Sequence, residues 1–420
     1  MNVSRSFVSR LFCWFAGALL ACAAASPVEA QVATITALFK PDSARPHLNK
    51  FTNTTPPSGY CANYPQQCEA NQFFSLQVPI QFNSRAPIPA NHSSPRQGAM
   101  LKVPAQWREL TVHHETTGDP QKVRVRIAGI GSKAVTDDVK ELVGGADDYQ
   151  IAHNRLWGAS WVYAPSPCQT SGNGYYGTYF YLFFWKTPIV GACAKQAKFD
   201  VPWLRFDYLD FGYELETPNP LGMASGQYTG SLTYSVGPNG DFDFGDVLLP
   251  TDSALTLDFN LDVQHTLKVD IPPGGEKLQL VPAGGWQSWL HAGRKPVRLF
   301  RDQTFHISAS SRFKMYFECE RWSTYDCVIK DAIGRRPVEL RVGVSLPNGL
   351  TDLSGQPVKH QRLKWGPEGA QIFQPGFYVD RAPGVLHFEV PEYEVEWMLQ
   401  QPNIASPYTG RVTVIWDSEV

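Results

Sequence analysis

Alternation between apolar and polar residues is the dominant pattern along the chain. Over 255–269, leucine, phenylalanine and valine recur at alternate positions, separated mainly by threonine, aspartate and asparagine. A similar period of two recurs over 73–82, 338–344 and 385–390. Because successive side chains of a strand point to opposite faces, this period predicts strands that bury one face. A helical period is scarce, with 135–143 the best candidate, so an all-β fold of turn-linked sandwiches is expected.

A short internal repeat gives the expected domain plan. The motif Tyr-Thr-Gly, followed by any residue, then Leu or Val, then Thr, starts at Tyr228 and again at Tyr408. Both copies are turns that lead into an alternating strand, and we interpret each as the last strand of a β-sandwich. The repeat therefore predicts a first domain over 31–250 and a second domain over 251–420.

Composition supports the β prediction and narrows the partners. Aromatic residues make up 13% of the chain and charged residues only 18%, against a usual charged share of about 25%. The chain holds 34 glycines and 33 prolines, which favours many turns over charged surface helices. A net charge of −2 without a basic stripe gives no electrostatic footprint for nucleic acid, so no nucleic-acid partner is expected.

The first thirty residues have the pattern of a secretory signal peptide. Two arginines precede an apolar run over 11–25, and small residues at 28–30 would place Gln31 first in the mature chain. An alternative is a lipoprotein cleavage box at 19–22. No later stretch reaches the roughly 18 consecutive apolar residues that a membrane helix needs. We therefore expect an exported chain.

Six cysteines remain outside the signal segment. An even number in an exported chain predicts disulfides. Pairing of neighbours in the sequence is favoured because each pair then closes a short loop, although six cysteines allow other connectivities. The expected pairs are Cys61 with Cys68, Cys168 with Cys193, and Cys319 with Cys327. No two cysteines have the close spacing typical of zinc sites, so no metal is expected there.

The segment that begins at the second Tyr-Thr-Gly copy is the most informative part of the chain. Alternation places on one strand face the residues Tyr408, Gly410, Val412, Val414 and Trp416. A glycine inside a strand usually marks a bulge or a close approach of backbone. The sequence given stops four residues later, at Val420, and a strand in that position is expected to leave an edge that needs a partner.

This segment resembles the C-terminal strand of chaperone–usher pilus subunits, which carries Tyr-x-Gly followed by alternating hydrophobic residues. The resemblance implies two immunoglobulin-like β-sandwich domains, of which the C-terminal one is an incomplete pilin sandwich that needs a donor strand. In that family a periplasmic chaperone lends the strand, and the N-terminal extension of the next pilin subunit later replaces it. Tyr408, Gly410, Val412, Val414 and Trp416 would then line the donor-strand groove.

The expected pair of domains makes the chain similar to tip subunits, in which an N-terminal adhesin domain precedes a pilin domain. Among these, it is similar to minor tip pilins of the alternate class, as in cable pili and class 5 fimbriae. The resemblance implies export through the periplasm, assembly by an outer-membrane usher, an extracellular place at the pilus tip and attachment to a surface receptor, with a glycan the expected class. The basic receptor patch of class 5 adhesins has no counterpart at 208–213, so the receptor does not carry over.

Three alternatives stay open at this point. The chain can be a minor structural pilin that initiates assembly without binding a receptor, or a secreted carbohydrate-active enzyme with jelly-roll domains. The segment 32–39 is expected to be the first strand of the first domain. If it were instead a donor strand, the subunit would lie below the tip.

The candidate receptor site lies in the aromatic-rich region 157–185. Within it, 171–177 has the composition of a loop, and tyrosine and tryptophan offer an apolar face with a polar group. A purely structural role, in which these aromatics cover the core edge, stays open. The predicted receptor-binding residues are Arg155, Trp157, Asn173, Tyr175 and Tyr176.

No motif predicts catalysis, a metal or a cofactor. His113 and His114 are adjacent, so on a strand they point to opposite faces and do not easily share one ion. The segment 241–246 places three aspartates around a glycine, which suits calcium, but its alternation with phenylalanine suits a strand equally well. No serine, histidine and aspartate set has the local context of a hydrolase. We therefore expect a binding protein rather than an enzyme.

Overall fold

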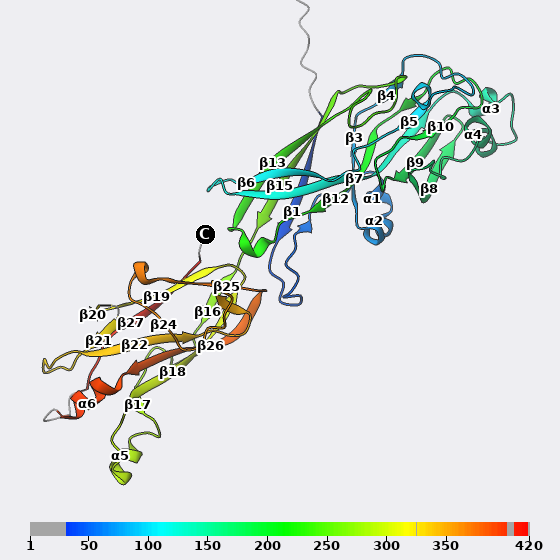
Figure 1. Cartoon of the computed structure of the whole chain (residues 1–420). Helices are drawn as coiled ribbons and strands as arrows, with labels where there is room; N and C mark the ends of the chain where they lie inside the picture. Colours follow the sequence, from blue (N-terminus) through cyan, green and yellow to red (C-terminus); the bar gives the residue numbers. More distant parts are fainter. Residues whose placement is uncertain (1–30, 325, 401–406, 419–420) are drawn as a thin grey trace, which may run out of the picture.

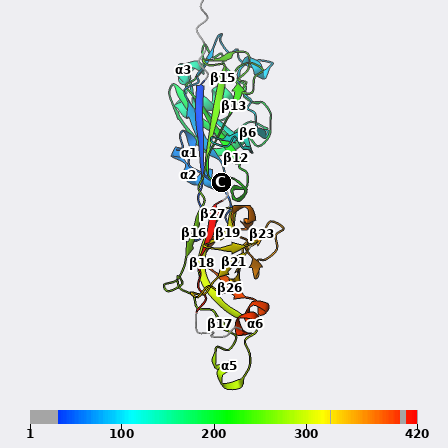
Figure 2. The same ribbon diagram turned by 90° about the vertical axis from the view of Figure 1, so that its left-hand side faces the viewer.

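The computed structural model describes residues 31–324, 326–400 and 407–418. The predicted signal peptide over 1–30 lies outside the described residues. Of the described residues, 46% lie in strands and 13% in helices, so the fold is mostly β, as the alternating pattern predicts. Figures 1 and 2 show the strands gathered into two bodies, one from the N-terminal part of the chain and one from the C-terminal part.

Each body has its own set of elements. In the first the strands are β1 (Gln31–Phe39), β2 (Thr52–Asn53), β3 (Phe74–Val78), β4 (Phe82–Ser84), β5 (Ala99–Leu101), β6 (Arg108–His114), β7 (Pro120–Val135), β8 (Gln169–Gly177), β9 (Phe180–Lys186), β10 (Cys193–Lys195), β11 (Arg205–Phe206), β12 (Leu209–Glu216), β13 (Gly226–Ser235), β14 (Leu248–Pro250) and β15 (Ala254–Val263). Its helices are α1 (Tyr60–Asn63), α2 (Pro65–Asn71), α3 (Val139–Leu142) and α4 (Tyr149–Trp157). In the second the strands are β16 (Leu267–Asp270), β17 (Val281–Pro282), β18 (Leu299–Ala309), β19 (Phe313–Cys319), β20 (Trp322–Ser323), β21 (Asp326–Ile329), β22 (Val338–Ser345), β23 (Leu350–Asp352), β24 (Gln361–Arg362), β25 (Gln371–Pro375), β26 (Val379–Val390) and β27 (Val412–Ser418), with helices α5 (Gln287–Ala292) and α6 (Glu392–Gln400).

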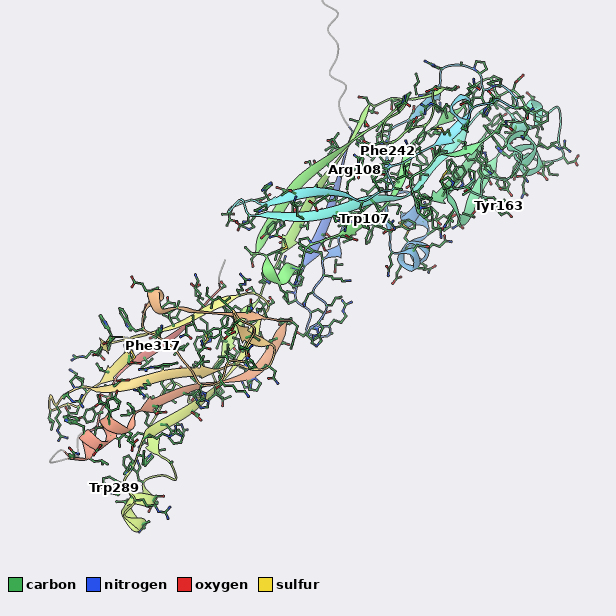
Figure 3. The ribbon with its side chains drawn as sticks, in the orientation of Figure 1. Trp107, Arg108, Tyr163, Phe242, Trp289 and Phe317 are labelled. Carbon is green, nitrogen blue, oxygen red and sulfur yellow. A yellow bond between two sulfur atoms is a disulfide. The ribbon has the colours of Figure 1, made fainter. Side chains whose placement is uncertain are left out.

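One large sheet dominates the first body, beside a small sheet in which β10 pairs with β5. The hydrogen-bonded path of the large sheet runs β14–β4–β11–β7–β6–β13–β15–β1–β2. Off this path, β12 pairs with β7 and β3, and β9 pairs with β7 and β8. The core below this sheet is rich in fully buried aromatic side chains, among them Trp161, Trp185, Phe206, Phe211 and Phe242. Figure 3 marks Phe242 inside this body.

The strand β15 belongs to this first sheet. Its inward residues Leu255, Leu257 and Leu261 are 0% exposed, as the alternation predicts. It pairs antiparallel with β13 and parallel with β1. The strand β13, which carries the first Tyr-Thr-Gly copy, is therefore not the last strand of its body. We propose that the two domains divide after Val263 rather than after residue 250.

The strand β1 lies inside the same sheet. It pairs along its whole length with β15 on one side, and at Ala37 and Leu38 with β2 on the other. The interpretation of 32–39 as the first strand of the first domain is confirmed, because this segment already has partners within its own body.

The second body is made of two sheets around a separate core. The first sheet runs β16–β18–β26–β22–β21–β20, and the second runs β23–β25–β19–β27. Buried phenylalanines from both sheets meet between them, including Phe305 of β18 and Phe317 of β19, each 0% exposed. Figure 3 labels Phe317 in this body. Period-2 burial in β22 and β26 confirms the strands predicted over 338–344 and 385–390.

The three disulfides pair as the sequence predicts. Cys61 joins Cys68, Cys168 joins Cys193, and Cys319 joins Cys327. Each closes a short loop, and such a bond typically stabilises a fold by about 2–4 kcal/mol. The first links α1 to α2 and so holds these two short helices against β3 and β12.

Within the described residues, every helix is too short or too polar to pass through a lipid bilayer.

Candidate functional site

The strand β27 has one unpaired edge. It pairs over its full length with β19, from Ser418 opposite Phe313 to Val412 opposite Cys319. It ends the four-stranded sheet, and no other described strand pairs with its second edge. An edge of this kind presents N–H and C=O groups that another strand can bind.

An apolar groove of about 500 Å³ lies beside this edge. All five residues that the sequence predicts for a donor-strand groove line it: Tyr408, Gly410, Val412, Val414 and Trp416. The opposite wall comes from the segment after β16, with Ile271, Leu278 and Leu280, and further lining comes from Leu340, Leu386 and Phe388. Figure 2 shows β27 and β16 along this part of the second body.

The inward face of β27 is incompletely covered. Val412, Val414 and Trp416 pack against the core but are only partly buried. Their neighbours on β19 that face the same core, Phe313, Met315 and Phe317, are 0% exposed. Burial of apolar surface is favourable by about 25 cal/mol per Å². Binding of an apolar segment in the groove is therefore favoured, because it would bury these side chains.

The opposite side of the groove has a second interrupted edge. Strand β16 pairs with β18 only at 306–309, and β17 pairs with it only at Leu299 and Phe300. Between them the chain passes through Pro272, Pro273 and Gly274, and proline cannot supply a ladder N–H. The middle of β18 is therefore paired only with β26 among the described strands, and its Gln303 lines the groove.

Gly410 has the role that its place in the motif predicts. A Cβ at this position would lie 2.8 Å from Ile329 Cγ2, closer than carbon atoms normally approach. The neighbouring Thr409 exchanges backbone hydrogen bonds with Lys330, at 2.8 Å and 3.1 Å. The glycine thus lets this segment lie directly on the end of β21, where it closes one end of the groove.

The five residues predicted for receptor binding do not form one cluster. Trp157 is 5% exposed and packs edge-on against Trp161, so its ring does not reach the surface. Arg155 donates a hydrogen bond to the carbonyl of Gly145, 3.0 Å away. Tyr176 packs against Tyr149 and Tyr181 and covers the core.

Only Asn173 and Tyr175 meet at a pocket, which is lined mainly by residues that the sequence analysis did not single out. The segment 171–177, predicted as a loop, is part of β8 instead. This strand pairs with β9 across a register shift between Thr170 and Gly174. The small residues that suggest a loop therefore accommodate a bulge in an edge strand.

The acidic segment 241–246 is satisfied by arginines. Arg96 lies 2.8 Å from Asp243 and 2.7 Å from Asp246, and Arg108 pairs with Asp241. Phe242 and Phe244 are buried, which agrees with the alternative that this segment alternates like a strand. Within the described residues, no group of three or more histidine, cysteine or acidic side chains is placed to hold a metal ion.

The histidine pair divides between two environments, as adjacent strand residues must. His113 is exposed and bonds the carbonyl of Gly118, whereas His114 is buried and bonds the carbonyl of Ser225. Each ring thus has a structural partner of its own, and the two do not face one site.

Comparisons with known proteins give distant matches among solved structures. No protein-family model matches the chain, and no curated protein matches its sequence. One matching structure is CfaE, the adhesive subunit of CFA/I fimbria of enterotoxigenic Escherichia coli, at 9% identity over 93% of both chains with a TM-score of 0.26. A chain of a CFA/I chaperone–tip adhesin complex matches at 9% identity over 93% of this chain and 97% of that one, with a TM-score of 0.24.

A further match is a chain of the CsuC–CsuE chaperone–tip adhesion subunit complex from archaic chaperone–usher Csu pili of Acinetobacter baumannii. It has 7% identity over 92% of this chain and 98% of that one, with a TM-score of 0.20. At TM-scores this low, these likenesses carry no weight for function, which has to be inferred from the groove and the pocket themselves.

Proposed function

We propose that this chain is the tip subunit of a chaperone–usher fibre, and that its second domain accepts a β-strand from another polypeptide. The observation that carries this proposal is the unpaired edge of β27 beside an apolar groove that its own side chains line. The two domains of the proposal are 31–263 and the remainder of the chain.

The shape and chemistry of the groove favour a strand as its occupant. An added strand satisfies the backbone edge of β27 along its length, and its alternate side chains fill the apolar space over Leu386 and Phe388. A compact ligand would leave the N–H and C=O groups of this edge without partners. A strand is therefore the occupant that meets both needs at once.

The donor is proposed to be another chain. The strand β1 is held in the first sheet by full-length pairing with β15 and by pairing of Ala37 and Leu38 with β2, so it is not free to fill the groove. The same pairing suits a tip position, since a subunit lower in a fibre has to donate a strand to its neighbour. In the proposed order of events a periplasmic chaperone lends the strand first, an outer-membrane usher receives the complex, and the next subunit then supplies its own strand.

Three disulfides suit a chain that folds in an oxidising compartment such as the periplasm. The proposal thus places the mature protein outside the cytoplasm, at the end of an extracellular fibre. There the first domain is proposed to bind a surface receptor, in a binding rather than a catalytic role.

A pair of matched variants tests strand capture. Val414→Asp puts a charge on the inward face of β27, whereas Thr413→Asp puts the same charge on the exposed face one residue away. Each variant is co-expressed with a periplasmic chaperone that captures the unaltered chain, and the amount that co-purifies is measured. We expect at least a tenfold loss for Val414→Asp, because a buried unpaired carboxylate opposes insertion, and little change for Thr413→Asp. Equal capture by both variants would contradict the proposal.

A further inference from the structure

A second pocket, of about 420 Å³, lies in the first body between the α1–α2 hairpin, β8 and β12. Tyrosine rings and amide side chains line most of it, together with one carboxyl group, and no lysine, arginine or histidine is among its lining residues. These residues include Tyr60, Asn63, Tyr64, Asn173, Tyr175 and Asp210. The pocket therefore combines apolar ring faces with hydrogen-bonding groups and lacks a countercharge for an anion.

Asp210 has an unpartnered oxygen at this pocket. Its side chain is on the face of β12 opposite Leu209 and Phe211, so it lies outside the main core and beneath α1. The residue is only 6% exposed, and its Oδ1 makes no hydrogen bond. Burial raises the pKa of this carboxyl to about 8, against the opposing effect of a hydrogen bond from the backbone of Tyr60.

The chain around Asp210 is shaped to leave it room. Gly59 has φ of +64°, a conformation that favours glycine. A Cβ at Gly59 would collide with both carboxyl oxygens of Asp210. The glycine thus permits α1 to cross close above the buried carboxyl group.

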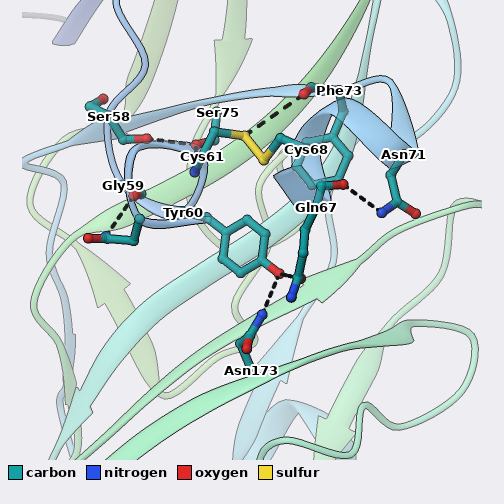
Figure 4. Close-up of a disulfide and its surroundings, with 11 residues drawn as sticks. Ser58, Gly59, Tyr60, Cys61, Gln67, Cys68, Asn71, Phe73, Ser75 and Asn173 are labelled. Atoms are coloured by element: carbon teal, nitrogen blue, oxygen red, sulfur yellow. Dashed lines mark hydrogen bonds between the residues drawn. A yellow bond between two sulfur atoms is a disulfide. The ribbon is translucent and has the colours of Figure 1, made fainter. Parts of the chain in front are cut away.

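A fixed network orients the aromatic side of the pocket. The ring of Tyr60 stacks on Phe184 with centroids 4.1 Å apart, and its hydroxyl binds Gln67 and Asn173. Figure 4 shows the hydrogen bonds of the Tyr60 hydroxyl with Gln67 and Asn173 beside the Cys61–Cys68 disulfide, which fixes the hairpin that carries Tyr60. At the rim, Tyr175 is 65% exposed and offers its ring to solvent.

We propose that this pocket binds an uncharged saccharide unit, with Asp210 hydrogen-bonded to its hydroxyl groups and Tyr175 packed on its ring. A buried neutral carboxyl can both donate and accept a hydrogen bond, which a hydroxyl group requires of its partner. Tyrosine faces suit the C–H surface of a sugar ring, and the amide of Asn63 adds a further polar contact. The inference deepens the proposed function, since it gives the ligand class of the first domain.

The chain offers a matched pair of variants for the test. Tyr175 and Tyr163 are both 65% exposed, but only Tyr175 lines the pocket. The full mature chain is examined by saturation-transfer NMR against D-glucose, D-galactose, D-mannose, L-fucose and N-acetyl-D-glucosamine. N-Acetylneuraminic acid serves as the anionic control and choline as the cationic control. We expect at least one neutral sugar to bind, Tyr175→Ala to weaken it about tenfold or more, and Tyr163→Ala to leave it unchanged.

Variants of Asp210 separate hydrogen bonding from a merely structural role. Asp210→Leu removes both donor and acceptor and is expected to lose binding at least tenfold, whereas Asp210→Asn keeps both and is expected to retain most of it. Thermal unfolding of each variant reports whether it folds. If Asp210→Leu does not fold, the comparison between Tyr175→Ala and Tyr163→Ala still decides the question.

Several outcomes would overturn the proposal. The proposal is wrong if only choline or only N-acetylneuraminic acid binds, or if no neutral sugar of the panel binds. It is also wrong if Tyr175→Ala leaves sugar binding intact. The groove variant Val414→Asp is carried through the same assay and is expected to bind sugar normally. If strand capture fails while sugar binds, only the tip-subunit proposal is contradicted. If strand capture succeeds while no sugar binds, only the proposal for this pocket is contradicted.

Discussion

At the residue scale, local periodicity predicts the groove better than it predicts the pocket. Val412, Val414 and Trp416 share a face because they are two residues apart on one strand, and the structure places all three at the groove. Asp210 gave no such signal. Its burial results from α1 crossing β12, a contact between segments about 150 residues apart in the chain, and no local pattern around Asp210 indicates it.

For Trp157 the sequence predicts a surface position, but the structure buries the residue. An aromatic-rich region with nearby glycines suggested an exposed binding surface, but the ring is enclosed by Trp161 and the sheet beneath it. Large aromatic side chains serve core and surface equally well. Sequence alone therefore could not separate the buried Trp157 from the exposed Tyr175.

Asp210 also predicts a pH dependence of stability. Its pKa is raised from 3.8 to about 8 in the folded chain because burial disfavours the charged form. Between these values the folded chain keeps a proton that the unfolded chain has released. The free energy of unfolding must then fall as pH rises through this window, by at most about 1.4 kcal/mol per pH unit, and the decline ends above the folded pKa. The neighbouring Tyr208 stays neutral throughout, since burial raises its pKa to about 12.

Asp210→Asn removes the titrating carboxyl group, so this variant serves as the reference for the pH dependence. Urea unfolding of both proteins at pH 5 and pH 7.5 is expected to show that the stability of the wild type relative to the variant drops by roughly 2–3 kcal/mol across this interval. Parallel pH profiles for the two proteins would show that the carboxyl group is ionised in the folded chain.

At the scale of elements, alternation identified strands well and their partners poorly. The period predicts the strand β15, but the Tyr-Thr-Gly repeat wrongly places it in the second domain, because the repeat predicts that the first domain ends before it. Pairing between β15 and β1 joins residues more than 200 positions apart, and the repeat carries no information about it. The glycines of β8 likewise suggested a loop, although a bulge next to β9 accommodates them.

The α1–α2 hairpin is the element whose stability depends most on its disulfide. Helices of 4 and 7 residues do not form alone in water. Replacing both Cys61 and Cys68 by serine is expected to lower the free energy of unfolding by about 2–3 kcal/mol. Amide hydrogen exchange over 58–73 should accelerate, while exchange in β13 stays slow. Unchanged exchange over 58–73 would mean that packing of Tyr60 and Phe73 alone holds the hairpin.

At the scale of the whole molecule, the two bodies differ in completeness. In the first body β1 pairs along its whole length with β15 and at Ala37 and Leu38 with β2, whereas the second body leaves β27 paired on one edge among the described strands. This asymmetry underlies the proposed division of labour, in which one body binds a ligand and the other receives a strand. Alternation in the Tyr-x-Gly segment predicts the apolar face of this strand and an edge that needs a partner, because both are local properties. That the partner is a strand of another chain is what the resemblance to chaperone–usher subunits implies.

Hydrogen–deuterium exchange over 412–418 tests strand acceptance most directly. The full mature chain is measured alone and in complex with a periplasmic chaperone that captures it. The account predicts that in the free chain the amides of β27 bonded to β19 exchange slowly while those on its other edge exchange fast, and that the complex slows the second set as well. Protection of every β27 amide in the free chain, or a complex that leaves the fast amides unchanged, would contradict it.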